Sequence, residues 1–106
     1  MLSFRIIEFE KSYMNILVVD DKKLVRENLF NTLTQLSHHV DCAVNGLDAL
    51  EKVKNNNYDL CIVDHLMPLM NGVQLTKNLK QNDLYKNIPI LFMTTQGIDA
   101  VKLLAE

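Results

Sequence analysis

The sequence lacks the features that mark disulfide-stabilised and nucleic-acid-binding proteins. It has only two cysteines, Cys42 and Cys61, and their spacing is not that of a CxxC pair. Both lie in apolar runs, which favours buried, reduced thiols over a disulfide or a metal-binding pair. The formal net charge is -2 and no basic block occurs, so we expect no binding to nucleic acid.

Long hydrophobic segments are also missing. No apolar run approaches the length that crosses a bilayer, so we expect no association with a membrane. Residues 1–13 lack a hydrophobic signal core and include Glu8 and Glu10, so we expect a cytoplasmic rather than a secreted protein. No internal repeat, low-complexity segment or linker is visible. A length of 106 residues suits one domain with a single modest core.

The sequence does contain a regular alternation of strand-like and helix-like segments. Apolar runs predict strands at residues 15–19, 39–44, 59–63 and 88–94. Apolar residues at helical spacing predict helices at residues 22–36, 47–55 and 72–82, with a fourth beginning near Gly97. Asn45 is placed to cap the second helix. Strands that alternate with helices indicate right-handed crossovers, and therefore a doubly wound parallel α/β sheet.

The first thirteen residues stand outside this pattern. Their apolar side chains allow an extra strand or a packed arm, whereas a mobile tail, or an upstream start before a true start at Met14, fits equally well. We therefore divide the chain into an N-terminal extension, residues 1–13, and a domain, residues 14–106.

Acidic residues follow two of the predicted strands. Asp20 and Asp21 come after the first strand, and Asp64 comes after the third. The carboxyl ends of parallel strands share one rim of the sheet, where ligands bind. Three carboxylates at that rim make an oxygen-rich site that suits Mg²⁺. Without a cation, their repulsion should raise at least one pKa. The alternative is that the acidic pair only caps the next helix and Asp64 is a turn residue.

Taken together, these pieces resemble the receiver domain of bacterial two-component response regulators. The matching pieces, in order, are Asp20-Asp21, Asn45-Gly46, Asp64 to Pro68 with Gly72, and Pro89 leading to Met93-Thr94. The resemblance covers residues 14–106 and implies a flavodoxin-like sheet with strand order 2-1-3-4-5, known for a chemotaxis member of that family. The sequence stops at Glu106, before the family's fifth strand and helix, so we expect a C-terminally truncated receiver with four strands. The end is either a cut in a longer protein or a natural truncation.

The resemblance implies a role for each matching residue. Asp64 matches the phosphoacceptor, which takes a phosphoryl group from a sensor histidine kinase or phosphotransfer protein. Asp21 and Asp64 match direct Mg²⁺ ligands, Asp20 matches a ligand that acts through water, and the backbone carbonyl of Leu66 matches the remaining protein ligand. Thr94 matches the switch hydroxyl that turns toward the new phosphoryl group. The implied chemistry is self-phosphorylation and self-dephosphorylation only, so the protein is not expected to be an enzyme.

Several positions depart from the family pattern. The family carries a lysine at the end of its fifth strand, and Lys102 lies in a predicted helix instead, so we expect poor phosphorylation of this chain. Lys22 and Lys23 follow the acidic pair and could lean over the site, but we expect them to face water. Two further positions match sites that affect hydrolysis of the phosphorylated aspartate in the family. The side chain of Leu66 cannot form a hydrogen bond, and the side chain of Gln96 is not a base. These two residues predict slow self-dephosphorylation.

We therefore expect a phosphorelay receiver that acts as a conformational switch. The alternative is a receiver-like interaction or dimerisation module that is not productively phosphorylated. It is favoured by the missing fifth strand, because an open apolar edge beside Ile90 and Phe92 invites a homodimer. A Mg²⁺-dependent phosphatase with an aspartate nucleophile is a third interpretation, but that class carries a second carboxylate where this sequence has Leu66.

Overall fold

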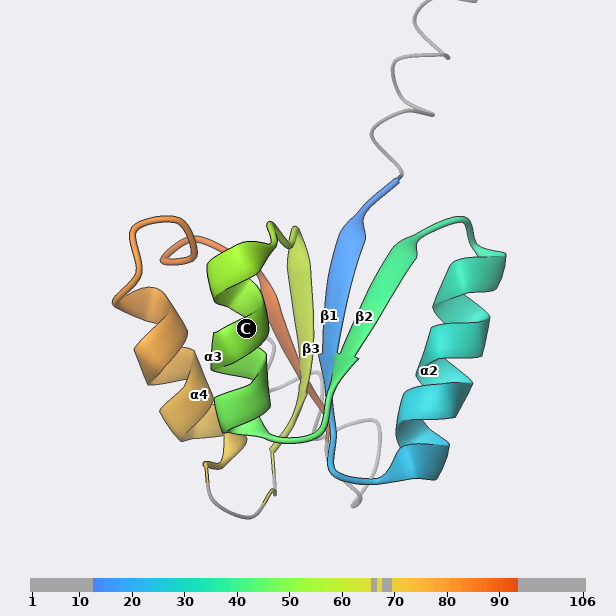
Figure 1. Cartoon of the computed structure of the whole chain (residues 1–106), viewed down its shortest axis with the longest axis horizontal. Coiled ribbons are helices and arrows are strands. Elements are labelled where there is room, and N and C mark those ends of the chain that lie inside the picture. Colours follow the sequence, from blue (N-terminus) through green and yellow to red (C-terminus); the bar gives the residue numbers. More distant parts are fainter. Residues whose placement is uncertain (1–12, 66, 68–69, 94–106) are drawn as a thin grey trace, which may run out of the picture.

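The structure is a computed structural model that describes residues 13–65, 67 and 70–93. Within these residues, four parallel strands form one sheet in the order β2-β1-β3-β4. The elements are β1 (Asn15–Val19), α2 (Lys23–Gln35), β2 (His39–Ala43), α3 (Gly46–Asn55), β3 (Leu60–Asp64), α4 (Gly72–Lys80) and β4 (Ile90–Met93). Helix α2 covers one face of the sheet, and α3 and α4 cover the other (Figure 1). The predicted doubly wound, flavodoxin-like architecture is confirmed.

The central strand β1 fixes where the sheet ends. Its pairing with β2 runs to Val19 opposite Ala43, and its pairing with β3 runs to Val19 opposite Val63. Residues 16–19 are all fully buried, as expected for a strand covered on both faces. Because the pairing is in register, β1 and β3 reach the carboxyl rim at the same level.

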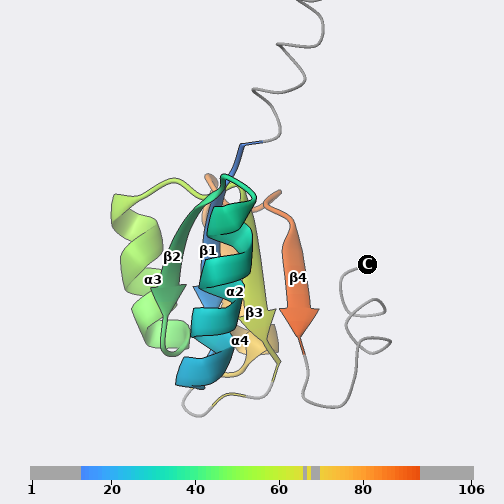
Figure 2. The ribbon, with the colours of Figure 1, turned by 90° about the vertical axis from the view of Figure 1, so that its right-hand side faces the viewer.

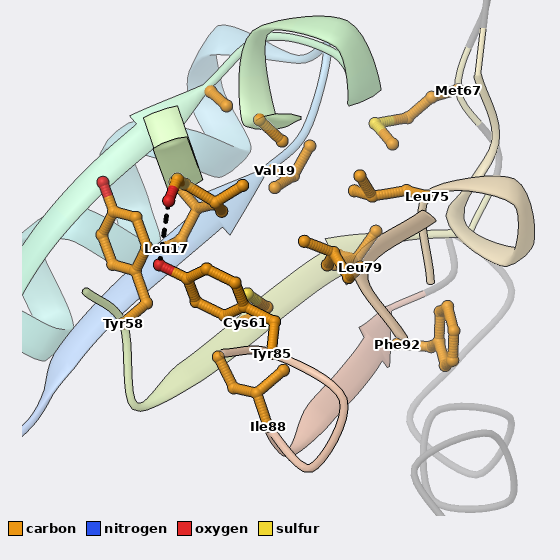
Figure 3. Close-up of a cluster of buried hydrophobic side chains, with 14 residues drawn as sticks. Leu17, Val19, Tyr58, Cys61, Met67, Leu75, Leu79, Tyr85, Ile88 and Phe92 are labelled. Atoms are coloured by element: carbon orange, nitrogen blue, oxygen red, sulfur yellow. Dashed lines mark hydrogen bonds between the residues drawn. The ribbon is translucent and has the colours of Figure 1, made fainter. Parts of the chain in front are cut away.

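The larger core lies between the sheet and helices α3 and α4. Leu17 and Val19 of β1 meet Val53 of α3 and Leu75 of α4 in one buried cluster (Figure 3). Tyr85 closes this cluster from the segment before β4, and its hydroxyl donates a hydrogen bond to the carbonyl of Val53 at 3.2 Å. This core holds α3 and α4 against β1 and β3.

The second core lies between the sheet and α2, and it is less completely covered. Ile16, Val18 and Ile62 are buried there, and Leu29 and Leu33 of α2 pack on them while staying partly exposed. Helix α2 packs over β1 and β2, with β4 beyond it at the edge of the described sheet (Figure 2). None of the residues of α2 is fully buried.

The helix and strand boundaries differ from the predictions by a few residues. Helix α3 begins at Gly46, since the side chain of Asn45 caps it by accepting from the N–H of Asp48 at 2.8 Å. Strand β3 extends through Asp64, which pairs with Met93 of β4. The N–H of Ile88 donates to the carbonyl of Tyr85 in a turn, so strand β4 begins only at Ile90. The predicted end of this strand at residue 94 lies outside the described residues.

Both cysteines are free, as predicted. Cys61 is buried in β3, and burial raises the pKa of its thiol to about 12, so it behaves as an unreactive hydrophobic residue. Cys42 in β2 is only partly buried, because β2 is an edge strand of the described sheet. Among the described residues, no helix has the length and apolar character needed to span a membrane.

Candidate functional site

The three acidic residues meet at the carboxyl rim of the sheet. Asp20 and Asp21 directly follow β1, and Asp64 is the last residue of the adjacent strand β3. One carboxylate oxygen from each residue lies within 4.8 Å of the other two. The in-register pairing of β1 with β3 produces this convergence. The expected acidic cluster is therefore present, although its role as a metal site stays a prediction.

The three carboxylates differ in their surroundings. Asp20 and Asp64 are 3% and 2% exposed, whereas the side chain of Asp21 is 34% exposed. Burial raises the pKa of Asp20, and the charge of Asp64 raises it further. A hydrogen bond of 2.8 Å from the N–H of Lys22 to Asp20 Oδ1 has the opposite effect, but the pKa remains raised. Two negative charges on the buried Asp20 and Asp64 are therefore unfavourable unless a cation lies near them.

Lys22 supplies such a cation, contrary to the expectation that it faces water. Its Nζ lies 3.1 Å from Asp64 Oδ2, 3.3 Å from Asp21 Oδ1 and 3.8 Å from Asp20 Oδ1. Lys22 is the N-cap of α2, with an extended backbone, so its side chain starts at the rim and is attracted back over it. The hydrogen bond to Asp64 raises the pKa of the Lys22 ammonium group.

Lys23 behaves as expected. Its side chain is 79% exposed and its Nζ lies 3.8 Å from Glu27 Oε1, one turn along α2. The two adjacent lysines therefore have different environments, since only Lys22 reaches the acidic cluster.

Arg26 also supports the site, and the sequence analysis did not identify it. Its Nη1 donates a hydrogen bond of 2.9 Å to the carbonyl of Asp20, whose own N–H donates to the carbonyl of Ala43 at 3.1 Å. The backbone of Asp20 is thus held from both sides. The available signal was the spacing of Arg26 four residues after Lys22, because that spacing places both residues on one face of the helix predicted at residues 22–36.

The N-terminus of α4 supports Asp64 from the other side. The N–H of Gly72 donates to the carbonyl of His65 at 3.2 Å, and the N–H of His65 donates to the carbonyl of Met93 at 2.8 Å. A Cβ atom at Gly72 would lie 3.0 Å from the carbonyl oxygen of Asp64 and 3.0 Å from a ring atom of Phe92. Glycine therefore allows α4 to approach the end of β3 closely.

Two of the predicted site residues lie outside the described residues. These are Leu66, the expected carbonyl ligand, and Thr94, the expected switch hydroxyl. Gln96, Lys102 and residues 1–12 lie outside as well. The roles assigned to these residues stay predictions.

Comparison with known proteins identifies the family. The profile of the response regulator receiver domain matches residues 16–105. This chain belongs to that family. A chemotaxis protein CheY homolog of Campylobacter jejuni is 40% identical over 86 residues, which cover 79% of this chain and 66% of that protein. The chain therefore spans slightly less than two thirds of the length of this relative.

Solved structures support the same assignment. Chemotaxis protein CheY4 of Vibrio cholerae superposes with a TM-score of 0.77 at 32% identity, over 84% of this chain and 74% of that one. The response regulator protein TrrA of Thermotoga maritima, solved in complex with Mg(2+)-BeF, gives a TM-score of 0.72 at 35% identity, over 78% and 70% of the two chains. The receiver fold predicted from the sequence is thus confirmed.

Proposed function

We propose that this chain is a phosphorelay receiver in which Asp64 accepts a phosphoryl group from a histidine kinase or phosphotransfer protein. The observation that carries the proposal is the convergence of Asp64 with Asp20 and Asp21, in a chain of the receiver family. We further propose that phosphorylation acts as a conformational switch, that Mg²⁺ is the cofactor, and that the protein works in the cytoplasm without any other enzymatic activity.

The residues at the rim fit a hard divalent cation. Asp20, Asp21 and Asp64 offer only carboxylate oxygens, the ligands that Mg²⁺ prefers. The ammonium group of Lys22 already lies among these oxygens, which indicates that the site stabilises positive charge. The three carboxylates, with the predicted carbonyl of Leu66, would hold the metal. When bound, Mg²⁺ would offset the charge of the incoming phosphoryl group.

The position of Asp64 supports its proposed role as the nucleophile. Its backbone is fixed by pairing with Met93 of β4, and its carboxylate lies at the rim. One carboxylate oxygen attacks phosphorus, an O–P bond forms, and the P–N bond of the donor phosphohistidine breaks with its electrons returning to the imidazole. The product is an acyl phosphate on Asp64.

Labelling with a small acyl-phosphate donor and Mg²⁺ tests the proposal. Mass spectrometry of the intact chain should show one added phosphoryl group on a small fraction of the parent, in line with the poor phosphorylation expected above, and none on Asp64→Asn or in EDTA. Asp59→Asn is the matched control, because Asp59 lies just before β3 at the opposite end of the sheet, where its side chain accepts the N–H of Asn15 at 2.8 Å.

The outcomes separate the two interpretations of the chain. Persistent labelling of Asp64→Asn would show that the acceptor lies elsewhere. A parent that stays unlabelled at saturating donor and Mg²⁺ would support the alternative, a receiver-like interaction module.

A further inference from the structure

We propose that Lys22 is a tethered cation that competes with the divalent metal for the three carboxylates. Metal binding then requires the ammonium group of Lys22 to leave the site, which lowers the affinity of this chain for Mg²⁺. The inference rests on the metal site proposed above. It concerns Lys22, which is not one of the proposed metal ligands.

The geometry places one positive charge on all three metal-ligand candidates. The Nζ of Lys22 lies 3.1 Å, 3.3 Å and 3.8 Å from oxygens of Asp64, Asp21 and Asp20. These distances are those of ion pairs, and two of them satisfy hydrogen-bond criteria. A metal ion on the same oxygens would lie close to the ammonium group, and like charges at such short separation repel strongly. The two cations therefore exclude each other.

The side chain of Lys22 can move away from the carboxylates without disturbing the backbone of the rim. Its side chain is 43% exposed, and a lysine ammonium is strongly hydrated on a flexible stem. Its backbone is fixed separately: the N–H donates to Asp20 Oδ1 at 2.8 Å, and the carbonyl accepts from the N–H of Arg26 at 3.1 Å. Only the side chain has to move, and the hydrogen bond that orients Asp20 stays in place.

Lys23 provides a matched control one residue away. Replacing either lysine by methionine removes one positive charge and keeps a side chain of similar length. Lys23 contacts Glu27 on the exposed surface of α2, at 3.8 Å, instead of the acidic cluster. Any change caused by net charge alone should therefore appear equally in both variants.

The test is a calorimetric titration of the full chain with Mg²⁺, for the parent, Lys22→Met and Lys23→Met at one ionic strength. We expect Lys22→Met to bind Mg²⁺ about threefold to tenfold more tightly than the parent, the range expected for loss of partly exposed ion pairs. Lys23→Met should stay within about twofold of the parent. In EDTA, Lys22→Met should melt at a lower temperature than Lys23→Met, because its three carboxylates have lost their neighbouring cation.

Each outcome decides one question. Tighter binding by Lys22→Met alone supports the competition. Equal or weaker binding by Lys22→Met, in a variant shown to be folded by circular dichroism, overturns the competition and leaves the metal site intact. No Mg²⁺ binding by any of the three proteins refutes the metal site itself. If Lys22→Met does not fold without metal, Lys22→Gln gives the same comparison, since it removes the charge but keeps a hydrogen-bond donor.

Discussion

Replacing Gly72 by alanine should destabilise the protein and disturb the end of β3. Gly72 is the first residue of α4, and the added Cβ would lie 3.0 Å from the carbonyl oxygen of Asp64 and 3.1 Å from His65 Cα. The third close atom, at 3.0 Å, belongs to the ring of Phe92. Two of the three obstacles are thus backbone atoms, which cannot rotate away as a flexible side chain can.

The expected magnitude follows from two opposing effects. Inserting one methyl group into a well-packed site costs about 1–3 kcal/mol. Alanine is a better helix former than glycine, which offsets at most about 1 kcal/mol. Because two of the three obstacles are backbone atoms, the insertion should cost about 2–3 kcal/mol, and we therefore expect the free energy of unfolding of Gly72→Ala to fall by about 1–2 kcal/mol. In a domain of this size, each kcal/mol lowers Tm by roughly 4–8 °C.

Urea unfolding, monitored by circular dichroism, measures this change. Lys77→Ala is the control: it is an exposed substitution in the same helix, and its free energy of unfolding should stay within about 0.5 kcal/mol of the parent. Gly72→Ala should also be measured in a Phe92→Leu background, where most of the cost should remain because the backbone contacts are unchanged. A variant as stable as the parent, or more stable, would refute the argument from close approach. Loss of the whole cost in the Phe92→Leu background would assign it to the ring alone.

Three further predictions concern other parts of the molecule. Tyr58→Phe should cost about 1 kcal/mol at pH 7, because the hydroxyl donates to Asp41 Oδ2 at 2.7 Å. Burial and this bond raise the pKa of Tyr58. The contribution of the hydroxyl to stability is therefore complete below the ordinary pKa of 10.0 and is lost as pH rises through the folded-state pKa. Comparing the free energies of unfolding at pH 7 and pH 11 checks this. Leu75→Ala, in the core, should cost about 2–5 kcal/mol, and Leu84→Ala, at 77% exposure, almost nothing in the same assay. Sedimentation at micromolar concentration should show a homodimer that pairs along β4, an edge strand of the described sheet; a monomer with and without residues 1–13 would contradict this.

The strands and the acidic rim could be predicted because they depend on local pattern. The first strand was predicted at residues 15–19 and is found at Asn15–Val19, since a run of apolar residues suits a strand that is buried on both faces. Once β1 and β3 are parallel neighbours, the acidic residues after each strand must approach one another. The convergence of Asp20 and Asp64 therefore follows from sequence order and fold class.

The contact of Lys22 with Asp64 could not be predicted in this way. The two residues are 42 positions apart, and the contact depends on the backbone geometry of one N-cap residue. The burial of Tyr85 was missed for a similar reason. It lies outside any helix or strand, yet it is 1% exposed because its hydroxyl reaches the carbonyls of Val53 and Asn56 at the end of α3. Contacts between irregular segments and distant elements leave no periodic signal in a sequence.

In the proposed metal site, the groups that would hold the metal differ from the group that would have to move. The carboxylates of Asp20 and Asp64 are buried and fixed through their backbones, whereas the side chain of Lys22 is 43% exposed. Two substitutions should therefore change Mg²⁺ affinity in opposite directions. Gly72→Ala displaces the backbone that carries Asp64 and should weaken binding, whereas Lys22→Met leaves that backbone unchanged, removes a competing charge, and should strengthen binding. Weaker binding in both variants would mean that Lys22 helps to shape the site, and that the position of the carboxylates depends on it.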